Sequence, residues 1–275
     1  MGLGFSFMNT VELAKKIRIN AVRMVNKGGS SHIGSVLSIT DILAVLYGSI
    51  MKYKSTDPKW DKRDRFILSK GHAGAGVYAA LAECGFFDPE RLMEHYQDGS
   101  VFSGHVSHKG IPGVELSTGA LGHGLPVGVG MAYAAKLDNK KHQVFVLMSD
   151  GELNEGSNWE ALLFASHHNL SNLTAIIDRN KLQSMASTEV TMALEPLKDK
   201  FTAFGWHVEE VDGHNHIAMC DALKPQIRNV PTMIIANTVK GKGVSYMENE
   251  VAWHYRTPTG KLFDQAIKEL QGSKA

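Results

Sequence analysis

Two short apolar segments, each followed by polar residues, most constrain how this chain can fold. Residues 144–148 and residues 173–177 are apolar runs of strand length. Between them, residues 155–169 have the length of a helix, with an apolar face formed by Trp159, Leu162, Leu163 and Ala165. This order predicts a βαβ unit with two parallel strands, because such a crossover returns the chain in the same direction.

Polar side chains follow both predicted strands. Asp150 and Gly151 come after the first, and Asn180 comes after the second. A right-handed crossover brings both strand ends to one edge of the sheet, where open α/β sheets bind ligands. A carboxylate, an amide oxygen and a nearby main-chain carbonyl are hard ligands that suit Mg²⁺ carrying a diphosphate. We therefore predict Asp150 and Asn180 as metal ligands, although an Asp-Gly pair by itself is also a common turn.

Length and composition favour one α/β domain over residues 1–275, with a parallel sheet flanked by helices. The chain has 275 residues, of which 43% are hydrophobic, and no linker or repeat divides it. Its 29 basic and 28 acidic residues lack the charge excess of a nucleic-acid binder. We find no apolar run of the roughly 18–20 residues that cross a bilayer, so we expect no membrane association. The two cysteines are far apart, which favours a reducing, cytoplasmic setting.

The ends of the chain predict two helices. The first begins at Asn9 or Thr10, with Glu12 near its start, and ends before Gly28 and Gly29. Residues 263–270 form an amphipathic pattern followed by a polar tail, and we expect the chain to end naturally there.

Residues 117–136 change from turn residues to the small-residue face of a helix. The amino terminus of such a helix offers free N–H groups to an anion, and glycine lets the backbone approach closely. Close packing of the helix against a neighbour explains the same glycines equally well. The spacing does not match the dinucleotide-binding fingerprint, which excludes that class of site.

The polar segments resemble a known cofactor signature. Residues 149–156, together with residues 180–182, resemble the thiamine diphosphate motif, which usually begins Gly-Asp-Gly and here has Ser149 first. Serine suits a strand end that does not need positive φ, but it can shift the loop that faces the diphosphate. Further segments follow the order found in the amino-terminal half of transketolases: 30–34, 69–74, 104–105, 112–115, 117–122, 211–214 and 253–254. The resemblance covers nearly the whole chain and implies a thiamine diphosphate-binding fold. It also implies that the main-chain carbonyl of Leu182 is the third metal ligand.

The resemblance also implies roles for five histidines. His32, His105 and His254 would contact substrate oxygens and move protons, because an imidazole that titrates near neutral pH can donate and then recover a proton. His72 would lie on the diphosphate side. His214 is expected to support a strand-to-helix turn.

Four other residues receive roles by the same resemblance. Gly119 and Leu121 would lie along the cofactor, with Asp150, Gly151 and Asn180. Glu155 and Glu160 would lie at an interface between chains, where they connect with the partner's glutamate that protonates the aminopyrimidine of the cofactor. Of the two, Glu155 is the stronger catalytic candidate. Compensation of a helix dipole is the simpler explanation for both.

Transketolases continue well beyond the length of this chain, and the resemblance therefore implies the amino-terminal subunit of a split enzyme. Such an enzyme transfers a two-carbon ketol unit from a ketose phosphate to an aldose phosphate, with thiamine diphosphate and Mg²⁺ as cofactors. We expect this subunit to be inactive alone and to form a heterotetramer with a carboxyl-terminal transketolase subunit. Pentose phosphates are the default substrates.

Three alternatives stay open. The α subunit of a 2-oxo-acid dehydrogenase has a similar metal signature without this histidine set. An enzyme similar to deoxyxylulose-phosphate synthase would decarboxylate pyruvate. A non-catalytic scaffold paralogue would keep the fold and lose the chemistry.

Overall fold

A sheet of five parallel strands lies at the centre of the computed structural model, which describes residues 9–225 and 228–272. Its order is β1-β2-β3-β5-β4. The strands are β1 (Arg65–Leu68), β2 (Val144–Ser149), β3 (Leu173–Arg179), β4 (His207–Asp212) and β5 (Thr232–Asn237). The predicted βαβ unit is confirmed, because β2 and β3 pair in parallel with Ser149 opposite Asp178 and are joined through α5 (Gly156–His167). The predicted parallel sheet flanked by helices is confirmed as well.

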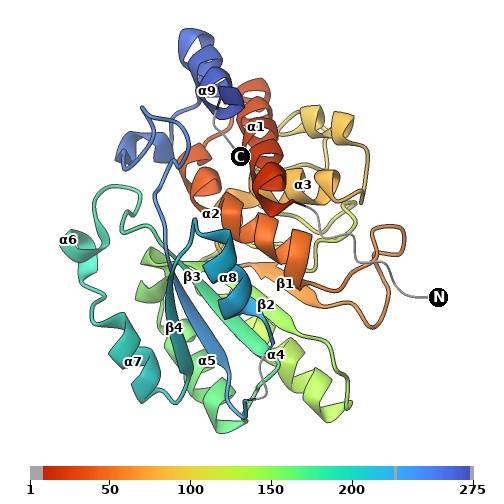
Figure 1. Cartoon of the computed structure of the whole chain (residues 1–275), viewed down its shortest axis with the longest axis vertical. Coiled ribbons are helices and arrows are strands. Elements are labelled where there is room, and N and C mark those ends of the chain that lie inside the picture. Colours follow the sequence, from red (N-terminus) through yellow and green to blue (C-terminus); the bar gives the residue numbers. More distant parts are fainter. Residues whose placement is uncertain (1–8, 226–227, 273–275) are drawn as a thin grey trace.

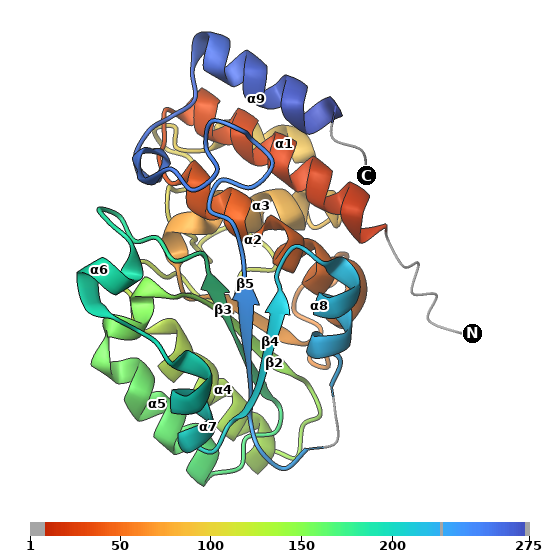
Figure 2. The same ribbon diagram turned by 60° about the vertical axis from the view of Figure 1, so that its left-hand side comes forward.

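Helices cover both faces of the sheet, so the central strands are apolar on both sides. In β2, Phe145 and Leu147 face one buried cluster, while Val146 and Met148 face the other. The first cluster includes α1, α2, α3 and α8, and the second includes α4, α5 and α7 (Figures 1 and 2). Their bounds are α1 Thr10–Gly28, α2 Ile33–Val45, α3 Gly74–Glu83, α4 Gly124–Leu137, α7 Leu197–Ala203 and α8 His216–Leu223.

Both predicted terminal helices are present. The Asn9 side chain caps α1 by accepting hydrogen bonds from the N–H groups of Val11 and Glu12, and Gly29 ends it with a φ of 62°. The last helix, α9 (Gly260–Gly272), packs against α1 and begins earlier than the sequence predicts. The polar tail at residues 273–275 lies outside the described residues.

One helical segment corrects the expectation about membrane length. The 18-residue window from Ile33 to Ile50 covers α2 and the π-helical turn after it, and its mean hydropathy is 1.7. By length and composition it could cross a membrane. However, 83% of the window is buried inside the protein, and every residue of α2 is buried. The segment therefore has the burial of a core helix.

Two glycines of α4 allow close packing, one against the residue that follows β1 and the other against β2. A Cβ atom on Gly124 would lie 2.3 Å from Ser69 Oγ, and one on Gly128 would lie 2.4 Å from Val146 Cγ2. Just before the helix, the N–H group of Gly122 donates to Glu152 Oε1 at 2.9 Å. A protein carboxylate therefore binds the glycine-rich turn that leads into α4. Of the two explanations for this segment, close packing has the structural support.

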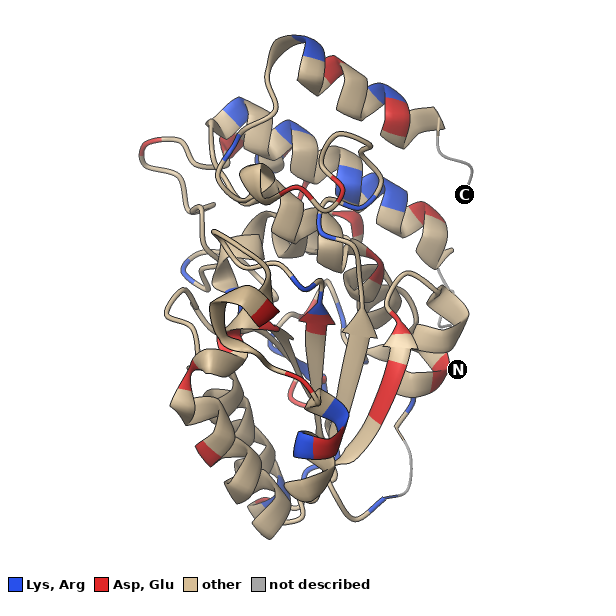
Figure 3. Cartoon of the chain, turned by 90° about the vertical axis from the view of Figure 1, so that its left-hand side faces the viewer, with Lys and Arg blue, Asp and Glu red and all other residues tan. Residues whose placement is uncertain are grey.

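The carboxyl ends of the strands point toward the layer that contains α1, α2 and α3 (Figure 2). Charged residues lie at some of these strand tips, while acidic and basic residues are mixed along the outer helices (Figure 3). The charged strand tips border the site described next.

Candidate functional site

Loops that follow β1, β2, β3 and β5 surround a cavity of about 240 Å³ at the carboxyl edge of the sheet. Seven residues predicted from the sequence line it: His72, Leu121, Asp150, Gly151, Asn180, Leu182 and His254. The other lining residues are Ser35, Lys70, Ser149, Gln183, Ser184, Lys240 and Tyr255. Segments far apart in the sequence therefore converge on one cavity, as the predicted topology requires.

Asp150 is 1% exposed and is held by three donors. Its Oδ1 accepts from the Gly151 N–H at 2.8 Å, and its Oδ2 accepts from the Lys181 N–H at 2.6 Å and from Arg179 Nη1 at 3.2 Å. Burial, and then the nearby Asp178 carboxylate, raise the pKa of Asp150 above its ordinary value. A cation in the cavity would favour the ionised form of this carboxylate. The preceding Ser149 does not have a positive φ, so the replacement of the usual glycine causes no backbone strain there.

The other two predicted metal ligands lie on the loop after β3. Asn180 Nδ2 donates to Asp178 Oδ2 at 2.8 Å, and Asn180 Oδ1 accepts from the Leu182 N–H at 3.0 Å. Lys181, between them, has a φ of 66°, which turns the loop sharply. No group of three His, Cys, Asp or Glu side chains within residues 9–225 and 228–272 could hold a metal. The protein part of a cation site here would consist of carboxylate, amide and carbonyl oxygens.

Two buried lysines make the cavity receptive to an anion. Lys70 and Lys240 are each 1% exposed. Lys70 Nζ pairs with Asp178 Oδ2 at 2.5 Å, whereas Lys240 Nζ donates to the Leu182 and Gln183 carbonyl oxygens at 3.2 and 3.1 Å. Burial, followed by repulsion from Lys70, lowers the pKa of Lys240 to about 8. A bound anion would stabilise both ammonium groups.

The four histidines predicted for the site form one cluster. The ring centroid of His32 lies 5.2 Å from that of His72, 5.6 Å from that of His105 and 4.9 Å from that of His254. The backbone of His32 has a φ of 71°, and its N–H donates to the His254 carbonyl oxygen at 2.9 Å. A non-glycine residue in this conformation is strained, and the surrounding contacts fix it.

All four imidazoles favour the neutral form. Burial lowers the pKa of His254 to about 3, with Lys240 as the next cause, and burial and then His105 lower the pKa of His32 to about 4. Burial also lowers the pKa of His105, and it holds the pKa of His72 well below its ordinary value. A neutral imidazole has one donor and one acceptor nitrogen, so the cluster can both donate and accept hydrogen bonds. The expectation that these imidazoles titrate near neutral pH is wrong for this structure, because burial lowers their pKa values.

The His254 pKa predicts a pH effect on stability. Unfolded His254 takes a proton as pH falls below about 6.5, but the folded side chain resists protonation until about pH 3. Stability should therefore fall between these two values as the solution becomes more acidic. Between pH 7 and pH 5 we expect His254 to remove on the order of 1 kcal/mol of unfolding free energy, after allowance for its partial contact with water.

Urea unfolding at pH 7 and pH 5 measures this effect. The His254→Gln variant should lose less unfolding free energy than the wild type over this interval. An equal loss in both proteins would show that His254 does not cause the effect.

The four remaining predicted residues lie outside the cavity lining. A Cβ atom on Gly119 would lie 3.4 Å from His105 Cδ2, so this glycine borders the histidine cluster. Glu155 and Glu160 are exposed near the start of α5, and their role at an interface stays a prediction. His214 binds Asp41 Oδ2 through Nδ1 at 2.6 Å and accepts from the Val239 N–H through Nε2 at 2.8 Å, which confirms its place at the turn before α8.

The sequence did not identify Lys70, Lys240 and Glu152. Lys70 and Glu152 lie inside segments that the resemblance includes, 69–74 and 149–156, and this was the available signal for them. Glu152 is 0% exposed and accepts hydrogen bonds from Ser69 Oγ and from the Gly122 and Ser149 N–H groups. It holds the loops after β1 and β2 together.

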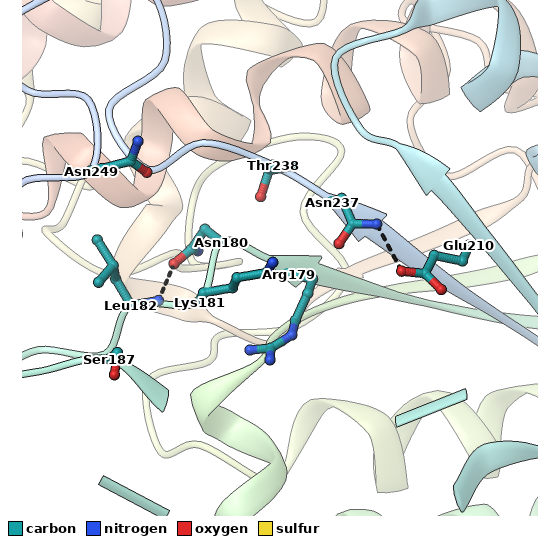
Figure 4. Close-up of a pocket in the computed structure, with 9 residues that line it drawn as sticks. All are labelled: Arg179, Asn180, Lys181, Leu182, Ser187, Glu210, Asn237, Thr238 and Asn249. Atoms are coloured by element: carbon teal, nitrogen blue, oxygen red, sulfur yellow. Dashed lines mark hydrogen bonds between the residues drawn. The ribbon is translucent and has the colours of Figure 1, made fainter. Parts of the chain in front are cut away.

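A second cavity, of about 490 Å³, is also bordered by the loop after β3. Asn180 and Leu182 line both cavities, and Figure 4 shows the hydrogen bond between them. Asn237 Nδ2 donates to Glu210 Oε1 at 3.0 Å on the far wall. The loop that carries two predicted metal ligands is therefore open to a cavity on two sides.

Comparison with known proteins identifies similar chains. Residues 9–271 match the family model described as "Transketolase, thiamine diphosphate binding domain". An apulose-4-phosphate transketolase subunit from Phocaeicola vulgatus is 43% identical over 270 residues, which cover 96% of this chain and 94% of that protein. A 6-deoxy-6-sulfo-D-fructose transketolase subunit from a Clostridium species is 40% identical over 260 residues, covering 94% of each chain.

The solved structures agree with this comparison. Transketolase from Leishmania mexicana superposes with a TM-score of 0.89 at 32% identity, over 96% of this chain. The match covers 42% of the Leishmania chain. The chain therefore spans about two fifths of that solved transketolase and nearly the full length of the subunits compared above.

Proposed function

This chain belongs to the transketolase family, and from that premise we propose that it is the amino-terminal subunit of a split transketolase. The activity is transfer of a two-carbon ketol unit from a ketose phosphate to an aldose phosphate. The observation that carries the proposal is the convergence of Asp150, Asn180, two buried lysines and four histidines at one sheet edge. This set combines cation ligands, anion-binding groups and proton carriers.

The residues present fit thiamine diphosphate and a divalent cation. Oxygens of Asp150, Asn180 and Leu182 would hold Mg²⁺, while Lys70 and Lys240 would face the diphosphate. Gly151 lets the loop after β2 pack closely against Gln183, since a Cβ atom there would lie 2.9 Å from Gln183 Cγ. When bound, the cofactor supplies the nucleophilic carbon that the side chains lack.

The histidine cluster would serve the sugar. We assign His32, His105 and His254 to the substrate oxygens. A bound anion beside the cluster would raise their lowered pKa values, so that an imidazole could accept a hydroxyl proton and return it. His72 would lie on the diphosphate side, close to Lys70. Tyr255 is 62% exposed, and its ring centroid lies 4.7 Å from that of His254. It borders the side from which a sugar would enter.

The buried lysines of the cavity and the named substrates of two relatives support an anionic sugar as the substrate. Two relatives act, by name, on apulose 4-phosphate and on 6-deoxy-6-sulfo-D-fructose, both anionic sugars. We propose an anionic ketose as the donor, with pentose phosphates as the default. The reaction belongs to carbohydrate metabolism, and the presence of only two cysteines, both free, supports a cytoplasmic setting.

The partner would be a separate carboxyl-terminal transketolase subunit in a heterotetramer. The length comparison supports this, because the match covers 94% of a relative that is named as a transketolase subunit but 42% of a solved transketolase. Exposed Glu155 and Glu160 are available for an interface between chains. We propose Glu155 as the residue that connects with the activating glutamate of the partner.

A substrate panel tests the proposal against its alternatives. The mixed subunits, with thiamine diphosphate and Mg²⁺, should transfer ketol units from xylulose 5-phosphate or another anionic ketose to an aldose phosphate. His32→Ala and His105→Ala should each reduce this transfer. Decarboxylation of pyruvate without ketol transfer would instead support a synthase or dehydrogenase, and folded but inactive mixtures would support a scaffold.

A further inference from the structure

Arg179, at the end of β3, is a buried cation beside the predicted metal ligand Asp150. It is 2% exposed. Its guanidinium donates to Asp150 Oδ2 at 3.2 Å, to Thr188 Oγ1 at 2.8 Å, and to Oε1 of Glu189 and Glu195 at 3.0 and 2.7 Å. In Figure 4 the side chain extends away from Asn180. Arg179 therefore joins the cofactor loop to residues 188–195, which include α6 (Thr188–Met192).

Arg179 binds Oδ2 of Asp150, so Oδ1 keeps one acceptor site for a cation. A carboxylate oxygen offers two acceptor sites. Oδ2 receives two hydrogen bonds, from the Lys181 N–H and from Arg179 Nη1, whereas Oδ1 receives one, from the Gly151 N–H. The remaining acceptor site on Oδ1 can bind a cation. Without Arg179, the carboxylate would lose one of its three anchors and could rotate.

The glutamates explain how a guanidinium can lie so close to a cation site. Arginine stays protonated at any physiological pH, so by itself it would repel a divalent ion. Glu189 and Glu195 bind the side of Arg179 that does not contact Asp150, and their side chains are 42% and 53% exposed. Since these carboxylates are partly hydrated, they can balance the buried charge without a large desolvation penalty.

We propose that Arg179 is a positioning residue, which holds Asp150 so that its Oδ1 faces the metal that carries the cofactor diphosphate. Glu189 and Glu195 keep Arg179 in place and neutralise it. This inference rests on the proposed function and adds a residue that the sequence did not single out for the site.

Calorimetric titration of Mg²⁺ into the complex with the carboxyl-terminal subunit, at saturating thiamine diphosphate, tests the role without measuring turnover. Partners that orient a metal ligand typically change metal affinity 10- to 100-fold when they are removed. Arg179→Met should therefore raise the dissociation constant for Mg²⁺ by about 10- to 100-fold. Arg179→Lys should have an intermediate effect, because it keeps the charge but has fewer donors.

Arg63→Met is the matched control. Arg63 forms a partly buried two-donor pair with Glu115 at 3.1 and 2.7 Å, and neither residue lines the cofactor cavity. This variant should lose an ion pair and keep the Mg²⁺ affinity of the wild type. A general loss of stability would lower the melting temperature of both variants, whereas the positioning role predicts weaker Mg²⁺ binding in Arg179→Met alone.

The outcomes separate this inference from the proposed function. A wild-type complex that does not bind Mg²⁺ with thiamine diphosphate would overturn the proposed function and, with it, the role of Arg179. Wild-type binding with the same affinity in Arg179→Met would overturn the positioning role alone. If Arg179→Met does not fold, the double variant Glu189→Gln/Glu195→Gln tests the same idea, because it leaves the guanidinium unbalanced. Its Mg²⁺ affinity should fall severalfold, and an unchanged affinity would contradict the proposal.

Discussion

Replacement of Asp150 by alanine should weaken metal-dependent binding of thiamine diphosphate by more than about 100-fold and abolish measurable ketol transfer by the mixed subunits. The side chain is the one carboxylate among the proposed metal ligands, and it is 1% exposed in the cavity wall. Removal of a group that merely orients a metal ligand already costs up to about 100-fold, so loss of the ligand itself should exceed that. Calorimetry and the transfer assay measure the two effects.

Asp64→Ala is the control for Asp150→Ala. Asp64 is likewise buried, at 4% exposed, and accepts from the N–H groups of Lys52 and Gln143 at 2.8 Å each. It lies immediately before β1, whereas the cavity that Asp150 lines lies at the opposite edge of the sheet. Asp64→Ala should lower stability and retain cofactor binding. Retained binding in Asp150→Ala would contradict the metal assignment.

Replacement of Lys70 by methionine should lower the free energy of unfolding by about 3–5 kcal/mol, the usual effect of removing one partner of a buried ion pair. Lys70 and Asp178 are 1% and 0% exposed, and their charged atoms are 2.5 Å apart. Burial opposes ionisation of Asp178, but Lys70 holds the pKa of this carboxyl below its ordinary value. Without Lys70, the carboxylate keeps hydroxyl donors from Ser38 and Thr238 and loses its closest positive charge.

A double variant separates charge from packing in this pair. Lys70→Met/Asp178→Asn removes the unpaired carboxylate, so it should be more stable than Lys70→Met. Urea unfolding of the wild type and the two variants gives the comparison. If Lys70→Met lowers the free energy of unfolding by less than about 1 kcal/mol, the prediction is contradicted, because the buried Asp178 carboxylate would then not depend on Lys70.

The central part of the fold could be predicted because two apolar segments separated by a helix are compatible with few arrangements other than a βαβ unit. The segments at residues 144–148 and 173–177 are buried on both sides in β2 and β3, and a helix of the expected length connects them. The positions of Asp150 and Asn180 follow from that topology, since both come directly after a strand. Parallel strands then bring them to one edge without any knowledge of side-chain contacts.

The buried charges of the site could not be predicted in the same way. Lys70, Lys240, Glu152 and Arg179 are each at most 2% exposed, but charged residues are usually expected at the surface. Each is stabilised by groups distant in sequence or by loop geometry, such as the Leu182 carbonyl oxygen beside Lys240. A single sequence does not reveal these partners. The resemblance to transketolases identified residues within the family's motifs, whereas the role of Arg179 follows only from its contacts in the folded chain.

The roles proposed for the two exposed glutamates near the start of α5 depend on a second chain. Glu155 and Glu160 are exposed, so their proposed role depends on a surface that only a second chain can supply. Their spacing on a helix fits dipole compensation equally well. An account of the cofactor's activation therefore requires the assembled enzyme.

Calorimetric titration of thiamine diphosphate with Mg²⁺, into this chain alone and into its mixture with a carboxyl-terminal transketolase subunit, tests the central claim most directly. A ketol-transfer assay on the same samples completes the measurement. We predict tight binding and turnover only in the mixture, because the cofactor would lie between the two subunits. Appreciable turnover by the single chain would contradict the split-enzyme assignment, and a folded mixture that binds no cofactor would contradict the assignment of the site.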